Sequence, residues 1–240
     1  MVLWMIATTA AYFVKGLCGF ANTMVFTGIL SFTDTNNVDI SPVDLLMCYF
    51  ANVFIVVRER KHIEWRVCLP MAGLMILGCI PGLFFLKNGG PGIVKIGFGI
   101  VIAVLGAKML WESIKPPKAK KDSKWSTAII GILAGVMCGM YGVGALVSAY
   151  MARKSRDTSS FRGNICTAFL IEDTLRMILY AVTGVITVEA LKRAAILLPF
   201  ILLGMLLGIK SVGKVKEQTA KRIVMVTLIV SGIVLVINNL

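Results

Sequence analysis

Eight apolar segments recur along the chain. They cover residues 3–32, 43–57, 67–86, 93–111, 126–151, 164–184, 191–209 and 223–238. A helix needs about 20 apolar residues to cross the hydrocarbon core of a bilayer, and most of these segments approach that length. The segments leave no stretch long enough for a separate soluble domain, so the sequence predicts an all-α polytopic membrane protein.

Composition and charge agree with a membrane protein. The chain is 58% hydrophobic, against roughly 45–50% in soluble domains. Its net charge of +13 would suggest nucleic acid in a soluble protein. Here the basic residues lie in short loops between apolar segments, which is typical of membrane topology signals. We therefore expect the lipid bilayer as a partner and no nucleic acid.

Two of the segments are interrupted by glycines, and the interruptions match each other. Segment 3–32 is broken at "KGLCG" and segment 126–151 at "GVMCGMYGVG". The Cys-Gly pairs of the two breaks lie 120 residues apart, which is half the chain. Later positions also correspond: Pro70 is followed by Gly78 and Gly82, and Pro199 by Gly204 and Gly208. This order predicts two four-segment repeats.

The distribution of Lys and Arg decides between two topologies. If all eight segments cross, the two sides of the membrane carry 11 basic loop residues each. If 3–32 and 126–151 are re-entrant hairpins, the loops divide 18 against 4, which the positive-inside rule favours. Each repeat then has three full crossings, so the repeats are inverted, as in many secondary transporters. Both termini are then expected to be extracytoplasmic in the cell (cytoplasmic) membrane.

The predicted organisation has three parts. They are a first repeat at 1–111 (hairpin 3–32, helices 43–57, 67–86 and 93–111), a basic cytoplasmic linker at 112–125, and a second repeat at 126–240 (hairpin 126–151, helices 164–184, 191–209 and 223–238).

The hairpin tips are the predicted binding site. Broken backbone at membrane depth must be buried in protein or line a wet cavity. The second arms are expected to begin near Phe20 and Tyr141, and two helix N-termini facing one cavity favour an anion. Lys15 lies at the first tip. Its ammonium either caps the carbonyls that end the first arm or attracts the anion, and these roles are not exclusive.

Segment 164–184 carries Glu172, Asp173 and Arg176 midway along its length. We interpret the two acidic residues as the only carboxylates at such depth, and Arg176 as the only arginine deep within a crossing. The alternative to a functional role is a self-neutralising pair within one helix. The functional interpretation makes Arg176 the anion anchor and Glu172 or Asp173 the proton-coupling group.

Other polar and small residues complete the predicted site, although each alone is also explained by helix packing. The remaining candidates for substrate binding are Gly19, Phe20, Asn22, Thr23, Asn52, Cys138, Gly139, Tyr141 and Gly142. The six cysteines form no CxxC pair and the chain has one histidine, His62. We therefore expect no metal site, no cofactor and no catalytic residues.

The chain resembles the TauE/SafE family of sulfite exporters and organosulfonate permeases. The resemblance is carried by "GLCGF", "GVMCGMYGVGALV", "RERKHIEWRVCLPMAG" and "FRGNICTAFLIEDTLRMILYAVTG" followed by "AILLPFILLGMLLG". It covers nearly the whole chain and implies export or uptake of a small anion such as sulfite, a sulfonate or a related carboxylate. The first tip departs from the family pattern, with Ala21-Asn22 in place of further glycine and the unusual Lys15. The resemblance therefore leaves the anion open.

These observations predict a secondary transporter rather than an enzyme, with proton coupling left open. A passive anion channel is the first alternative. A membrane-embedded enzyme is the second alternative. It would need a cluster of catalytic residues, and one loop histidine and one acidic pair do not supply one. A homodimer is the candidate assembly.

Overall fold

The computed structural model describes residues 1–30, 37–87, 124–141 and 144–211, together with scattered residues between 96 and 111 and between 225 and 237. The regular elements in these ranges are helical. In chain order they are α1 (Val2–Cys18), α2 (Asn22–Leu30), α3 (Asn37–Glu59), the 3₁₀ helix η1 (Arg60–His62), α4 (Trp65–Lys87), α6 (Lys124–Tyr141), α7 (Ala145–Lys154), α8 (Thr158–Val182) and α9 (Val188–Lys210).

Several helices have the length and composition of membrane spans. In the described part of the chain, three are long and apolar enough to cross a bilayer: Ile40–His62, Trp65–Gly82 and Val188–Lys210. Helix α8 has 25 residues but carries charged side chains in its interior. The described residues of segments 93–111 and 223–238 are helical. The prediction of an all-α protein with membrane-length helices is therefore confirmed.

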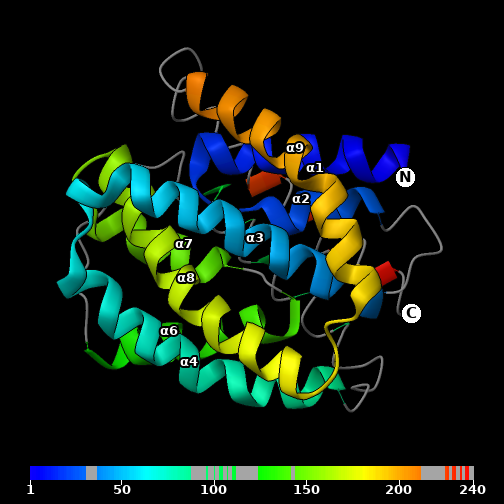
Figure 1. The fold of residues 1–240 in the computed structure, drawn as a ribbon. Helices are drawn as coiled ribbons and strands as arrows, with labels where there is room; N and C mark the ends of the chain where they lie inside the picture. The colour runs from blue at the N-terminus through cyan, green and yellow to red at the C-terminus, as the bar shows by residue number, and fades with distance from the viewer. Residues whose placement is uncertain are drawn as a thin grey trace.

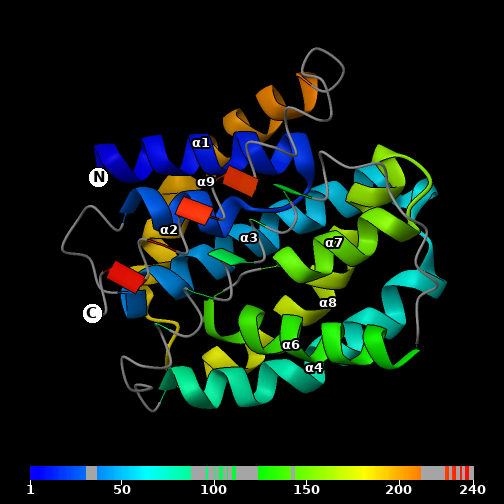
Figure 2. The same ribbon diagram turned by 180° about the vertical axis from the view of Figure 1, so that it is seen from behind.

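The helices lie in three layers (Figures 1 and 2). Helix α1 packs against α9 on one side of the molecule, and α4 packs against α6 on the opposite side. Helices α3 and α8 pack against each other between these pairs. The outward faces keep large apolar side chains exposed, among them Leu77 on α4 and Leu203 on α9. A lipid environment accommodates such faces, whereas water would not.

Small residues allow the outer helix pairs to approach closely. A Cβ atom added to Gly208 of α9 would lie 2.2 Å from the carbonyl oxygen of Phe13 on α1. One added to Gly78 of α4 would lie 2.1 Å from that of Ile132 on α6. Larger side chains are excluded at both positions, and such contacts are a main source of helix association in membranes. The spaced glycines of the two predicted repeats thus serve the same purpose.

Helix α8 begins at a side-chain cap. Asp157 accepts a hydrogen bond from the backbone N–H of Ser160 at 2.7 Å. The same hydrogen bond lowers the pKa of this exposed carboxyl below its usual value, because the bond favours the ionised form. The cap fixes the start of the helix that carries Arg176.

Candidate functional site

Both glycine-interrupted segments are broken helices. Helix α1 ends at Cys18, and Gly19 follows in the left-handed conformation with φ 82°. Ala21 also has a positive φ, 71°, which is costly for a residue with a Cβ. The chain then enters α2, which lies beside α1.

The second break lies between Tyr141, the last residue of α6, and Ala145, the first of α7. The second arm had been expected to begin near Tyr141, so that prediction was wrong by about one helical turn. Gly142 and the side chain of Tyr141 lie outside the described residues. The arms are also unequal, because α1 and α6 are 17 and 18 residues long but α2 and α7 only 9 and 10.

Three polar residues on α3 form one face of the site. Asp44, Cys48 and Asn52 are spaced four residues apart, which places them one above the other on a helix. All three are buried. Asp44 and Cys48 lie inside the predicted segment 43–57, but the sequence analysis did not include them among the site residues. The helix in fact begins at Asn37, so Asp44 lies about two turns inside it, and the four-residue spacing was the available signal.

Lys15 connects the first break to α3. Its ammonium is fully buried and donates hydrogen bonds to Asn22 Oδ1 at 3.1 Å and to Cys48 Sγ at 3.3 Å. Asn22 contacts Thr23 Oγ1 at 3.4 Å, and Thr23 donates to Asp44 Oδ2 at 2.6 Å. Within the described part of the chain, the Lys15 ammonium thus points towards α2 and α3 and not back to the carbonyls of α1.

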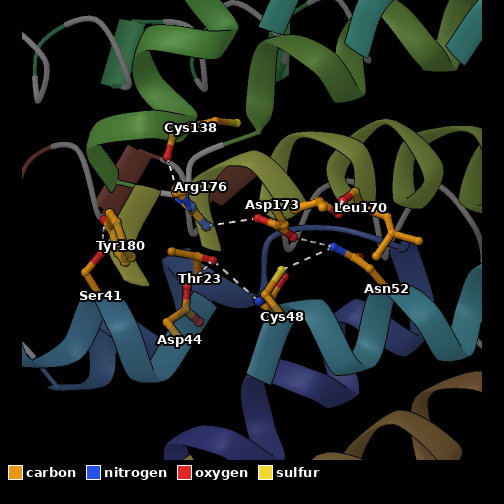
Figure 3. A network of polar contacts seen from close by, with 12 residues as sticks. Thr23, Ser41, Asp44, Cys48, Asn52, Cys138, Leu170, Asp173, Arg176 and Tyr180 are labelled. Atoms are coloured by element: carbon orange, nitrogen blue, oxygen red, sulfur yellow. Dashed lines mark hydrogen bonds and ion pairs between the residues drawn. The ribbon is translucent and has the colours of Figure 1, made fainter. Parts of the chain in front are cut away.

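Arg176 connects α3 to the second break (Figure 3). Asn52 donates to Cys48 Sγ at 3.5 Å and to Asp173 Oδ2 at 2.8 Å. Arg176 Nη2 donates to Asp173 Oδ1 at 3.0 Å, and its Nη1 donates to the carbonyl oxygen of Cys138 at 2.6 Å. These hydrogen bonds form one continuous set, which we call the tip-to-tip network. Its members, in order, are Asp44, Thr23, Asn22, Lys15, Cys48, Asn52, Asp173, Arg176 and Cys138. The network includes the ion pair within one helix that the sequence analysis gave as the alternative, between Arg176 and Asp173.

Two basic and three acidic side chains meet around this network. Each is at most 3% exposed: Lys15, Asp44, Glu172, Asp173 and Arg176. Glu172 lies beside Asp173 on α8, and its Oε1 has no hydrogen-bond partner among the described residues. Asp44 and Glu59, which were not among the predicted carboxylates, are also buried, and Glu59 is the last residue of α3.

Three predicted site residues serve packing. Phe20 stacks edge-to-face on Phe161, with ring centroids 5.9 Å apart. A Cβ on Gly19 would meet the side chain of Arg162 at 3.0 Å, and one on Gly139 would meet the carbonyl oxygen of Cys79 at 2.7 Å. These residues hold the breaks against α8 and α4.

A second buried arginine lies near the start of α8. Arg162 Nη2 donates to Glu59 Oε1 at 2.9 Å, and its Nη1 donates to the carbonyl oxygen of Gly16 at 3.3 Å. Arg162 lies close to the beginning of α8, so Arg176 remains the arginine midway along this helix. The predicted segment 164–184 leaves Arg162 in the preceding loop, whereas α8 begins at Thr158.

The described residues hold no group of three His, Cys, Asp or Glu side chains placed to bind a metal ion. The arrangement instead brings two buried cations and several hydrogen-bond donors, among them Asn22 at the start of α2, to the region between the breaks. Such groups can bind an anion, and intramembrane ionisable residues usually mark a transport pathway.

Comparisons with known proteins agree with this chemistry. The sequence model of the family "Sulfite exporter TauE/SafE" matches residues 4–235. A protein of Cupriavidus necator described as "Probable sulfite/organosulfonate exporter TauE" is 24% identical over 179 residues, which cover 72% of this chain and 69% of that protein. No solved structure matches. Because the family match spans nearly the whole chain, the protein belongs to the sulfite exporter TauE/SafE family and is a multi-pass membrane transporter, not an enzyme.

Proposed function

We propose that the protein is a secondary transporter that binds a small anion between its two helix breaks and moves it across the cytoplasmic membrane. Sulfite, a sulfonate or a related carboxylate is the substrate class. The tip-to-tip network carries this proposal, because it joins the buried cation at the first break to the buried cation at the second. The family and its Cupriavidus necator relative support the same substrate class.

Arg176 is the proposed anchor for the anion. A guanidinium can hold a planar or tetrahedral oxyanion through two parallel hydrogen bonds. Its Nε has no hydrogen-bond partner among the described residues, and its Nη2 is shared with Asp173. An anion that displaces Asp173 would engage this edge of the guanidinium. Asp173 would keep the hydrogen bond from Asn52.

Proton coupling follows from this competition. An ionised Glu172 or Asp173 neutralises Arg176 and opposes the anion, and its protonation removes that opposition. Anion affinity is therefore expected to rise as the pH falls. The variants Glu172→Gln and Asp173→Asn should flatten the dependence, and retention of the full dependence in both would remove these residues as coupling groups.

Two inverted repeats are proposed as the architecture behind alternating access. The packing supports this arrangement. If the two halves are exchanged, the packed pair α1 and α9 takes the place of the packed pair α6 and α4, and α3 and α8 take each other's places. Single cysteines at Ser123→Cys and Ser159→Cys, in a background without native cysteines, should both be protected from an impermeant thiol reagent in intact cells. Labelling of Ser159→Cys alone would show that segment 126–151 crosses completely.

Thermal shift of the purified protein tests the binding step. A ligand at 100 times its Kd stabilises the folded state by about 2.7 kcal/mol. We expect stabilisation by sulfite, methanesulfonate or acetate, with chloride as the control anion, and we expect it to be lost in Arg176→Gln but not in Arg193→Gln. Absence of a shift with every anion would contradict the proposal.

Flux in proteoliposomes separates a transporter from a channel. A coupled transporter should accumulate anion against its gradient when a pH gradient is imposed, whereas a channel should follow the membrane voltage alone. The proposed homodimer is tested on the same sample by its mass from light scattering.

A further inference from the structure

We propose that Asp44 is the proton-carrying carboxyl of the first half of the site, which takes up a proton together with the anion and thereby removes a negative charge that opposes anion binding at Lys15. This inference rests on the transport function proposed above. It adds to the Arg176 half of the site a second unit built from one cation and one carboxylate.

The hydrogen bonding of Asp44 differs from that of Asp173. Both Asp173 oxygens accept hydrogen bonds, one from Arg176 and one from Asn52. Asp44 Oδ2 accepts only the Thr23 hydroxyl, and Asp44 Oδ1 has no hydrogen-bond partner among the described residues. A buried anionic oxygen without a partner is costly. A proton on Oδ1 removes that charge and supplies a donor.

A directed chain of hydrogen bonds joins Asp44 to Lys15. Lys15 donates to Asn22, Asn22 to Thr23, and Thr23 to Asp44. The chain crosses the beginning of α2, immediately after the positive φ of Ala21. The charge of Asp44 therefore acts on Lys15 through the residues that form the first break.

The charges around Asp44 favour proton uptake when an anion binds. The ionisable groups that face it are Tyr12 and Lys15 on α1, Cys48 on its own helix, and Asp173 and Arg176 on α8. Counting Glu172, which lies next to Asp173, the region has three carboxylates and two cations. With all of them ionised it has one excess negative charge before the anion arrives. An added anion without a proton would enlarge that excess in a low-dielectric interior.

Infrared spectroscopy tests this inference without any ligand. The purified protein is titrated from pH 8 to pH 5 while the C=O stretching band of protonated carboxyls is recorded. We expect Asp44→Asn to remove one band, and Asp173→Asn and the exposed Asp157→Asn to leave it in place. Thr23→Val should move the same band to higher frequency, because the hydroxyl 2.6 Å from Oδ2 is lost. A carboxyl spectrum identical in wild type and Asp44→Asn would overturn the inference.

A binding experiment tests the coupling itself. Methanesulfonate is the probe because its charge does not change over this pH range. Asparagine is a neutral mimic of protonated Asp44 that can still accept from Thr23. We expect Asp44→Asn to bind methanesulfonate about tenfold more tightly than wild type at pH 8, and Asp44→Glu to restore the pH dependence. One coupled proton changes affinity up to tenfold per pH unit.

Equal pH profiles in Asp44→Asn and wild type would overturn the coupling role. Failure of the proposed function looks different, because wild type would then bind no anion at any pH while the infrared result still decides the protonation of Asp44. A variant that fails to fold is recognised by its elution from gel filtration, and the Thr23→Val band shift then decides the question.

Discussion

Helix α8 carries two buried arginines that make the same two kinds of contact. Arg162 and Arg176 each donate to one carboxylate and to one carbonyl oxygen near the end of a broken helix's first arm. They are 14 residues apart, which is about 21 Å along the helix. The difference lies in the carboxylate: Glu59 belongs to α3, whereas Asp173 lies three residues from Arg176 on α8 itself.

This difference supports the proposal that Arg162 is a structural clamp and Arg176 a binding group. Breaking the Arg162–Glu59 pair removes a connection between α8 and α3. Releasing Arg176 from Asp173 removes a contact within α8, and Asn52 still joins Asp173 to α3. Of these two arginines, Arg176 is the one whose carboxylate partner an anion could replace while Asn52 keeps α8 joined to α3. We therefore expect substitution of Arg176 to reduce transport and substitution of Arg162 to reduce stability.

Loss of transport at Arg176 is the largest expected effect. Arg176→Gln should abolish transport and weaken anion binding by at least about 30-fold, because removing one partner of a buried charged contact costs about 2–5 kcal/mol. Arg176→Lys should keep a small part of the activity, since it retains the charge but not the planar fork. Proteoliposome flux and equilibrium binding measure both. Wild-type affinity in Arg176→Gln would place the anion elsewhere, and Arg193→Gln is the matched control.

Loss of stability should dominate at Arg162. Arg162→Gln leaves Glu59 buried without its cation, which is expected to cost about 3–5 kcal/mol of unfolding free energy. The double variant with Glu59→Gln should recover part of that loss, because no unpaired charge remains. Denaturant unfolding in detergent is the measurement, with anion affinity followed on the same samples. A stable Arg162→Gln protein that fails to bind anion would remove the distinction between the two arginines.

Lys15 sharpens the comparison from the first half of the site. Lys15→Met keeps the length of the side chain but removes the charge beside Asn22 and Cys48. We expect the protein to fold and anion affinity to fall about tenfold, less than at Arg176, because an ammonium is a point charge without a bidentate fork. Lys192→Met, an exposed lysine on α9, is the control. Unchanged affinity would limit Lys15 to a structural contact between α1, α2 and α3.

The smallest effect is expected at the start of α8. The ionised form of Asp157 caps the helix and its pKa is lowered by the Ser160 N–H. Its contribution to stability is therefore complete above the pKa of the unfolded chain, about 4, and is lost as the pH falls through the lower folded value. Asp157→Asn retains the cap and should remove that acid-dependent part. Thermal unfolding between pH 6 and pH 3 measures the difference, and parallel curves for both proteins would contradict it.

The sequence was sufficient to locate both helix breaks and to single out Lys15 and Arg176, which the structure buries beside them. The reason is that a charge or a glycine cluster inside an apolar run has few explanations in a membrane protein. It did not reveal Asp44, which lies at the edge of segment 43–57, or Arg162, which lies outside segment 164–184. Hydropathy ends a segment where polar residues begin, whereas both helices begin earlier in the chain. Which donor meets which carboxylate depends on how α3 and α8 face each other, and no local pattern in one helix contains that information.

The charge content of α8 has a consequence for the making of the protein. Asp173 and Arg176, midway along α8, would each oppose insertion of an isolated helix by about 2.5–3.5 kcal/mol at mid-membrane. Every identified partner of Arg162 and Arg176 outside α8 precedes that helix in the chain. During co-translational insertion, the groups that compensate these arginines are therefore synthesised before α8.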